Sequence, residues 1–268
     1  MIVREHEGRL LLVRQTDHAA QCGVFAMHWG GDRVAEPAPR ASLVVAAAEH
    51  DNGWAEWEQA PRIDPATGQP FQFYTTPIDE HVALYRRGVA RVVERDPYAG
   101  LLVALHALRL YGQSYAGLPP LGRQYTAEER VHVTAFTAEL RALRDRLLDD
   151  LRQSPTYRPY VEERALQASF KLLQAWDLLS LHTLARPLRS GQTTPVPLVD
   201  GTQQRLTMTR LGAWRLGLDP YPFTTAPFVT PVPATVLPRR RYADDATLRR
   251  DLARAPTVTL EVRFDPTR

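Results

Sequence analysis

The chain has 268 residues with a formal net charge of +3, and 44% of the residues are hydrophobic. This length and composition provide enough apolar residues for a real core and exclude a disordered chain. The single cysteine, Cys22, excludes a disulfide framework and a cysteine-based zinc cluster, so a bound metal ion would need His, Asp and Glu ligands.

The distribution of charged and apolar residues also limits the partners. The basic residues are scattered, with one short run at residues 239–241, so nucleic-acid binding is not expected. The first residues lack the pattern of a secretory signal, and no apolar run approaches membrane-spanning length. We therefore expect a cytoplasmic protein without a membrane partner.

The first predicted element is a β-hairpin at residues 1–14, where two short apolar runs flank a turn. A helix follows over roughly residues 15–29, in which His18 shares the apolar face and should point inward. A second helix contains the small apolar run at residues 43–48 and leads directly into the adjacent pair His50 and Asp51.

Two further helices each carry one imidazole on the apolar side. The third begins near residue 77 and places His81 and Tyr85 in one inward stripe. The fourth places His106 on its buried face. Gly- and Pro-rich loops at residues 61–70 and 113–125 flank these helices, and long loops of this kind are often lids or binding loops.

The second half of the chain contains two helices and then changes character. Thr126 caps an amphipathic helix, and a helix at about residues 161–185 is apolar nearly all round, which predicts a central position. Asp177 lies in its middle, where an ionised carboxylate costs several kcal/mol unless it is paired or bound to a metal ion. Residues 191–264 show short alternating runs, which predict a small antiparallel sheet that the N-terminal hairpin could join.

The inward-facing polar residues follow the order His, His-Asp, His, His, Asp. They are His18, His50, Asp51, His81, His106 and Asp177. This order resembles the HD-domain superfamily of metal-dependent hydrolases, in the form with two additional histidines, over roughly residues 15–185. The Gln-x-Asp-His start and the His-Asp-Asn-Gly-Trp centre also resemble an uncharacterised bacterial family known as a domain of unknown function, which implies no activity.

The resemblance implies a mainly α fold. We expect a β-hairpin at residues 1–14, an HD-like helical metal-binding domain at 15–190 and a small antiparallel β appendage at 191–268, to which the hairpin contributes. Two features depart from the superfamily: Trp54 stands where phosphodiesterase members often have a lysine, and the interval from His106 to Asp177 is longer than usual.

The residue set implied by the resemblance can hold two divalent ions. His18, His50 and Asp177 would bind the first ion, His81 and His106 the second, and Asp51 would bridge them. Imidazole and carboxylate ligands suit iron, manganese or zinc. Asp51 and His81, with Asn52 beside them, are the candidate catalytic residues.

Other residues have both a functional and a structural interpretation. Gln15 and Asp17 could orient the ligands or cap helices. Trp54 and Tyr111 could line a substrate pocket or belong to the core. Arg123 could contact an anion or be a solvated loop residue.

The leading hypothesis is a metal-dependent phosphohydrolase acting on a small phosphomonoester or phosphodiester, with nucleotides among the candidates, through a hydroxide that bridges the metal ions. The same ligand order resembles the diiron oxygenases of the superfamily, such as myo-inositol oxygenase, which is the first alternative. A non-catalytic metal-binding sensor or scaffold is the second and predicts a closed site without an adjoining pocket. A homodimer is compatible with the sequence.

Overall fold

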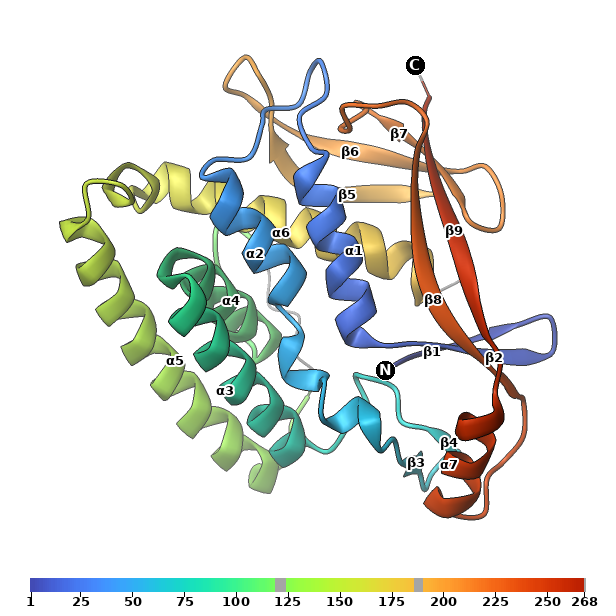
Figure 1. Cartoon of the computed structure of the whole chain (residues 1–268). Coiled ribbons are helices and arrows are strands. Elements are labelled where there is room, and N and C mark those ends of the chain that lie inside the picture. Colours follow the sequence, from blue (N-terminus) through green and yellow to red (C-terminus); the bar gives the residue numbers. More distant parts are fainter. Residues whose placement is uncertain (119–123, 186–189, 268) are drawn as a thin grey trace.

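The computed structural model describes residues 1–118, 124–185 and 190–267. It shows an α/β fold, with about 48% of the chain in helices and 24% in strands. Most of the helices form one layer, and a curled seven-stranded sheet lies beside them (Figure 1). The expectation of a mainly α protein with a small β appendage is therefore wrong, because the sheet is a large layer that supplies much of the core.

Seven α-helices and three short 3-10 helices are found in the described ranges. They are α1 (Gln15–Met27), α2 (Arg40–Glu49), η1 (Asn52–Trp54), η2 (Trp57–Gln59), α3 (Ile78–Arg95), α4 (Pro97–Leu110), α5 (Ala127–Gln153), η3 (Arg158–Tyr160), α6 (Glu163–Leu184) and α7 (Asp245–Arg254). None of them is both long and apolar enough to cross a lipid bilayer.

The large sheet combines the N-terminal hairpin with the C-terminal segment in the order β1-β2-β8-β9-β7-β6-β5. Neighbouring strands are antiparallel except β7 and β9, which run parallel. A separate two-stranded ribbon consists of β3 (Ile63–Asp64) and β4 (Gln69–Pro70). The large sheet consists of β1 (Ile2–His6), β2 (Arg9–Val13), β5 (Gly191–Pro197), β6 (Gln203–Arg210), β7 (Arg215–Asp219), β8 (Phe228–Pro238) and β9 (Thr257–Pro266).

Local signals in the sequence fix where several helices begin. The side chain of Asp96 caps α4 by accepting a hydrogen bond from the backbone N–H of Ala99. Thr126 and Glu129 form a capping box at the start of α5. These signals explain why the predicted helix starts agree with the observed ones.

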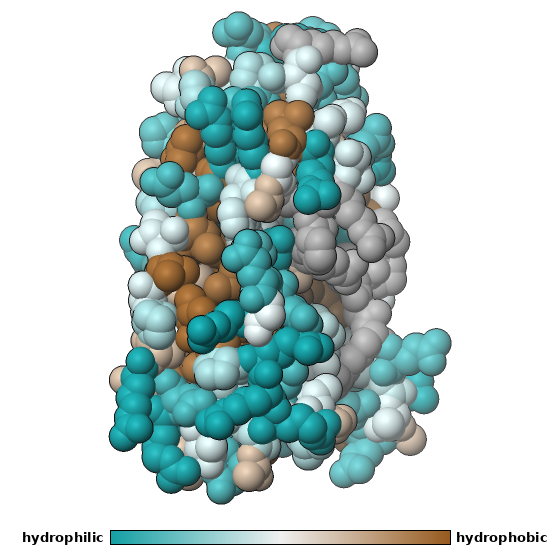
Figure 2. All heavy atoms as spheres, turned by 90° about the vertical axis from the view of Figure 1, so that its right-hand side faces the viewer, coloured by the Kyte–Doolittle hydropathy of each residue, from teal (hydrophilic) through white to brown (hydrophobic). Residues whose placement is uncertain are grey.

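Strand β8 shows why the sheet belongs to the core. Phe228, Thr230 and Val232 are buried, whereas the residues between them are exposed. This alternation gives this part of β8 one buried face and one solvent face. The side of the molecule that faces the viewer in Figure 2 carries mainly hydrophilic side chains, with a group of apolar ones gathered on the left of the view.

Helix α6 packs against α1 on one side and against β5 on another, which accounts for its nearly continuous apolar sequence. The buried Trp29 and Trp176 rings meet edge to face, with their centroids 5.7 Å apart. One apolar cluster extends from Ile2 in the hairpin through these helices to Phe264 in the last strand. The helical layer and the sheet therefore share one large apolar cluster, and a smaller cluster lies between the hairpin and α7, with Leu10, Leu237 and Leu248 among its members.

Gly53 allows η1 to approach α3 closely. A Cβ atom at this position would lie 2.1 Å from the Leu84 backbone oxygen, and Gly88 on the same helix faces Gly53. Because Gly53 is two residues from Asp51, this close packing also fixes the backbone that carries the His50 and Asp51 pair.

We predict that Gly53→Ala destabilises the protein by about 1–3 kcal/mol or more, because backbone must shift to admit the methyl group. Gly191→Ala is the control, since among the described residues a Cβ there meets side-chain atoms at 3.5 and 3.7 Å and no backbone. Urea unfolding should show a lower midpoint for Gly53→Ala and a change within about 1 kcal/mol for Gly191→Ala. Equal midpoints for the two variants would contradict the close contact.

Candidate metal centre

Three elements bring four predicted ligands together. His18 comes from α1, His50 and Asp51 follow α2, and Asp177 comes from the middle of α6. The exposed fractions of His18 and Asp177 are 0% and 7%, and the other two residues are equally buried. The site therefore lies inside the protein, at the contact between the first two helices and α6.

The four facing atoms form a ring in which nitrogen and oxygen alternate. His18 Nε2 lies 3.9 Å from Asp51 Oδ2 and 3.1 Å from Asp177 Oδ1. His50 Nε2 lies 3.6 Å from Asp51 Oδ2 and 3.7 Å from Asp177 Oδ1. The centre of a flat ring with such sides is about 2.5 Å from each atom, a few tenths of an ångström beyond the roughly 2.0–2.2 Å bonds of zinc.

The backbone fixes the orientation of His50. Its Nδ1 lies 2.8 Å from the Ala47 carbonyl oxygen and must donate to it, which leaves Nε2 with its lone pair in the neutral form. This Nε2 is buried and has no hydrogen-bond partner in the described part of the chain. It therefore needs either a proton or a cation between itself and the two carboxylates.

A chain of hydrogen bonds from the sheet orients His18. Gln21 donates from Nε2 to Thr230 on β8 over 2.8 Å, and its Oε1 accepts from the Ser180 hydroxyl over 2.6 Å. The Ser180 oxygen then accepts from His18 Nδ1 over 2.7 Å. In this arrangement the His18 Nε2 lone pair faces the Asp177 carboxylate, so two acceptors stand 3.1 Å apart.

The two carboxylates are held differently. Asp51 Oδ1 accepts from the Tyr85 hydroxyl over 2.6 Å, and Oδ2 accepts from Gln15 Nε2 over 3.0 Å. Asp177 depends on the histidines: burial alone would raise its pKa, but the adjacent imidazoles of His18 and His50 hold the pKa well below its usual range. Asp177 is therefore ionised at neutral pH.

The charge of the carboxylates also acts on His50. Burial alone would lower the pKa of its imidazole, but Asp51 and Asp177 outweigh that effect and raise the pKa to about 9. The centre therefore favours positive charge, which a proton on His50 or a metal ion can supply.

His106 lies at the edge of this centre, with its ring centroid 5.2 Å from that of His50. Burial lowers its pKa to about 4, so the ring is neutral at pH 7. Two sets of three ligand atoms in the described ranges are close enough to share an ion: His50 with Asp51 and His106, and His50 with His18 and Cys22. Burial raises the pKa of the Cys22 thiol well above its usual value, so Cys22 stays protonated and is a poor ligand.

His81 lies apart from both of these sets. Its Nδ1 is 2.6 Å from the Tyr111 hydroxyl, and its ring packs on Tyr85 with a centroid distance of 4.9 Å. The centroid of the Tyr85 ring also lies 6.3 Å from that of His106, so Tyr85 is a neighbour of both imidazoles. The structure thus brings five of the six predicted ligands together and leaves His81 outside these sets, packed on Tyr85.

The remaining predicted site residues occupy several environments. Asn52 donates to the backbone oxygens of Glu49 and Gly88 and ties α2 to α3, outside the cavity wall. Asp17 pairs with Arg14 at the surface instead of contacting the ligands. Trp54 and Tyr111 are buried behind His81, where they support its ring. Arg123 lies outside the described residues.

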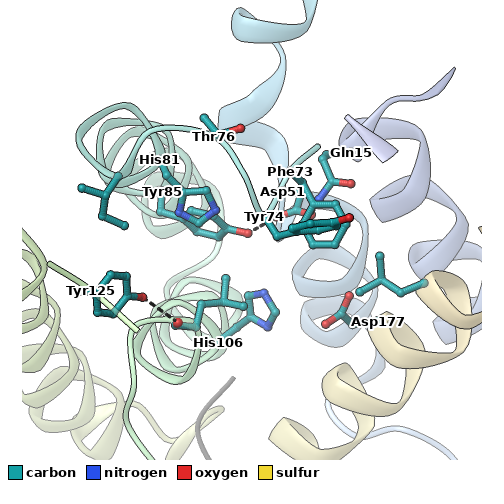
Figure 3. A pocket seen from close by; sticks show the side chains of 13 residues that line it. Gln15, Asp51, Phe73, Tyr74, Thr76, His81, Tyr85, His106, Tyr125 and Asp177 are labelled. Carbon is teal, nitrogen blue, oxygen red and sulfur yellow. Dashed lines mark hydrogen bonds between the residues drawn. The ribbon is translucent and has the colours of Figure 1, made fainter. Parts of the chain in front are cut away.

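A cavity of about 320 Å³ adjoins the centre. Figure 3 shows Tyr85 reaching from α3 towards Asp51, with His106 and Asp177 on the opposite side of the space. Phe73 and Tyr74 from the loop before α3 cover one side of the cavity. The centre is therefore within reach of a small molecule, although its four ring residues are buried.

Several polar residues of the site were not singled out from the sequence. Gln21 lies three residues after His18 on α1, and Gln174 and Ser180 lie three residues before and after Asp177 on α6. Residues three apart lie on the same helix face, so the spacing of these residues from the predicted ligands was the sequence signal that could have identified them. Tyr85 was assigned to the inward stripe but had no predicted role.

The fold and the site together define an α/β protein with a buried His/Asp centre beside a small cavity. The chain belongs to the family described as "Protein of unknown function (DUF3891)", whose profile matches residues 1–239. No curated protein and no solved structure matches the chain.

The raised pKa of His50 predicts how stability depends on pH in chelator-treated protein. Its stabilising effect is complete below the unfolded pKa of 6.5 and is lost as the pH rises through the folded pKa of about 9. The free energy of unfolding should fall by roughly 3 kcal/mol across this interval. Urea unfolding at several pH values should show this fall in the wild type and a flatter profile in His50→Gln. The same slope in both proteins would contradict the assignment.

Proposed function

We propose that this protein is a metal-dependent phosphohydrolase of the HD-domain type, with one divalent ion bound by His18, His50, Asp51 and Asp177. The observation that carries the proposal is the convergence of two imidazole Nε2 atoms and two carboxylate oxygens, in ring contacts of 3.1 to 3.9 Å. Iron, manganese and zinc all accept this mixture of ligands.

The residues present fit such an ion. The buried Nε2 of His50 has no hydrogen-bond partner in the described part of the chain, and a cation at the centre of the ring would satisfy it. His18 already donates its other nitrogen to Ser180, and His50 to Ala47, as is usual for metal-bound histidines.

The charge of the cavity supports dependence on a metal ion. Among its lining residues in the described ranges there is no Lys or Arg, whereas Asp51 and Asp177 both face it. A phosphate group entering this space would meet two carboxylates, so binding requires a cation between them. When bound, a divalent ion supplies a Lewis acid for a phosphoryl oxygen and lowers the pKa of water.

The chain's own residues would then hold the reacting groups. Tyr85 and Gln15 fix both oxygens of Asp51, so its carboxylate cannot rotate away from the centre. His81 and His106 are polar groups on the cavity wall, within reach of a substrate that enters past Phe73 and Tyr74. The aromatic and aliphatic wall excludes bulk water and suits a small phosphate ester with an apolar or aromatic group.

The alternatives have less support from the geometry. A diiron oxygenase needs a second ion held by His81 and His106, but neither set of close ligand atoms in the described ranges includes His81, whose ring packs on Tyr85. A structural or sensor site predicts no adjoining pocket, yet a cavity of about 320 Å³ opens on Asp51 and Asp177. The position of His81 therefore favours a single ion and hydrolysis.

We predict about one manganese, iron or zinc ion per chain in protein purified without chelator, as measured by elemental analysis. Asp177→Asn should lose the ion, and hydrolysis of phosphate esters should fall by more than the roughly 10–100-fold typical of groups that only orient ligands.

His81→Phe should keep one ion while turnover falls. Two ions in the wild type, with one lost in His81→Phe, would support the two-ion site instead. No turnover across a panel of nucleotides and phosphate esters by the metal-loaded wild type would contradict the proposed function.

We also predict that Ser180→Ala weakens zinc binding by roughly 10–100-fold, because His18 loses the acceptor that fixes its orientation. Ser169→Ala is the matched control, since Ser169 is buried on the same helix but bonds to Tyr98. Zinc affinity measured by competition with a coloured chelator should fall only in Ser180→Ala. An equal fall in both variants would indicate a general effect on α6.

A further inference from the structure

The hydrogen bonds behind His106 set the position of its proton. Arg109 donates through its NH1 to the Gln174 side-chain oxygen, and Gln174 Nε2 lies 2.8 Å from His106 Nδ1. All three residues are buried. The contacts therefore form one line from α4 to α6 and back to α4.

The donors in this line of hydrogen bonds allow one orientation of the Gln174 amide and one position of the His106 proton. A guanidinium can only donate, so the Gln174 oxygen must face Arg109 and the Gln174 NH₂ group must face His106. His106 Nδ1 therefore accepts a hydrogen bond and carries no proton. A cationic ring would set an N–H group against this NH₂ group, so the ring must be neutral with its proton on Nε2.

This arrangement is the reverse of that in His18 and His50. Those residues donate from Nδ1 and present the Nε2 lone pair, as a metal ligand must. In His106 the Nε2 atom is an N–H donor, has no hydrogen-bond partner in the described ranges and belongs to a residue that lines the cavity. A protonated Nε2 cannot coordinate a metal ion.

We propose that His106 is a catalytic hydrogen-bond donor to an oxygen of the bound phosphate group, and that Gln174 and Arg109 are positioning residues that hold its Nε2–H in that role. The proposal deepens the proposed function and rests on it for the identity of the bound group. No proton is transferred. The neutral N–H stabilises charge on the phosphate oxygen beside the ion, as fixed donors do in other active sites.

The first test reads the position of the proton directly. Protein labelled with ¹⁵N-histidine should show His106 protonated at Nε2 in long-range ¹H–¹⁵N spectra, both metal-free and zinc-loaded, with the signals assigned by their loss in His106→Phe. Inorganic phosphate added to the zinc-loaded protein should shift the Nε2–H resonance. The proposal would be overturned by an unprotonated Nε2 or by loss of this proton on zinc loading. It would also be overturned by an Nε2–H resonance that phosphate does not shift in either form.

The second test replaces the Gln174 amide, which donates to His106 Nδ1, with a group that accepts. In Gln174→Glu a carboxylate faces Nδ1, so the proton should move to Nδ1 and the Nε2 donor should be lost. Gln167→Glu adds the same charge on α6 at a residue whose amide faces the exposed Glu163 side chain, and it should leave the His106 spectrum unchanged. Phosphate-ester turnover should fall by roughly 100-fold in Gln174→Glu, with no loss of zinc. An unchanged tautomer in folded Gln174→Glu would overturn the role of Gln174.

The two tests separate this proposal from the proposed function. The tautomer is measured without substrate or turnover, so a protein that hydrolyses no phosphate ester still reports it. Failure to bind zinc would contradict the metal centre, whereas a bare His106 Nε2 in a zinc-binding protein would contradict only the donor role.

Discussion

Two carboxylates buried close together, Asp51 and Asp177, are the constraint on which the rest of the structure depends. Removing even one carboxylate charge from water is costly, and a second one nearby increases the cost unless positive charge and donors compensate. Asp51 receives two fixed donors, from Tyr85 and Gln15. In the described part of the chain Asp177 faces the imidazoles of His18 and His50 and has no such donors, and this difference explains why the centre attracts a proton to His50 in metal-free protein. A divalent cation would satisfy the same demand with more charge, which supports the proposed metal centre.

Both the helical layer and the sheet position the residues of this centre. The helices bring the ligands together, but the orientation of His18 is set through Ser180 and Gln21 by Thr230, a residue of the sheet. Helix α6, which carries Asp177, packs between α1 and β5, so it cannot move without disturbing both layers. The sheet is therefore part of the structure that positions the ligands. Substitutions in β8 should therefore affect the orientation of the candidate ligands, although that strand supplies no ligand.

The sequence predicted the helices well and the sheet poorly. Helical periodicity and caps such as Asp96 and Thr126 are local signals, and they placed the helix starts. Strand β8 carries Pro231 and Pro233, which argue against a central strand, yet it lies between β2 and β9 with these prolines on the solvent face. The pairing of the hairpin with this strand and the parallel contact of β7 with β9 join residues more than 40 positions apart. Periodicity within a segment contains no information about such pairs.

The same distinction between local and long-range information applies to the candidate site. An inward-facing position on a helix predicts burial, but it does not predict which neighbour each ring meets. His106 is buried as predicted, whereas His81 is only partly buried. Tyr85, one turn after His81, contributes to the outcome because its hydroxyl donates to Asp51 and its ring lies near both histidines. Tyr85 supplies a donor to Asp51, and His106 is bonded at Nδ1 to Gln174, which leaves its Nε2 as the proposed donor to the cavity. Neither the aromatic contact of Tyr85 nor the amide contact of Gln174 follows from the order of His and Asp residues, so that order alone could not predict the role of each histidine.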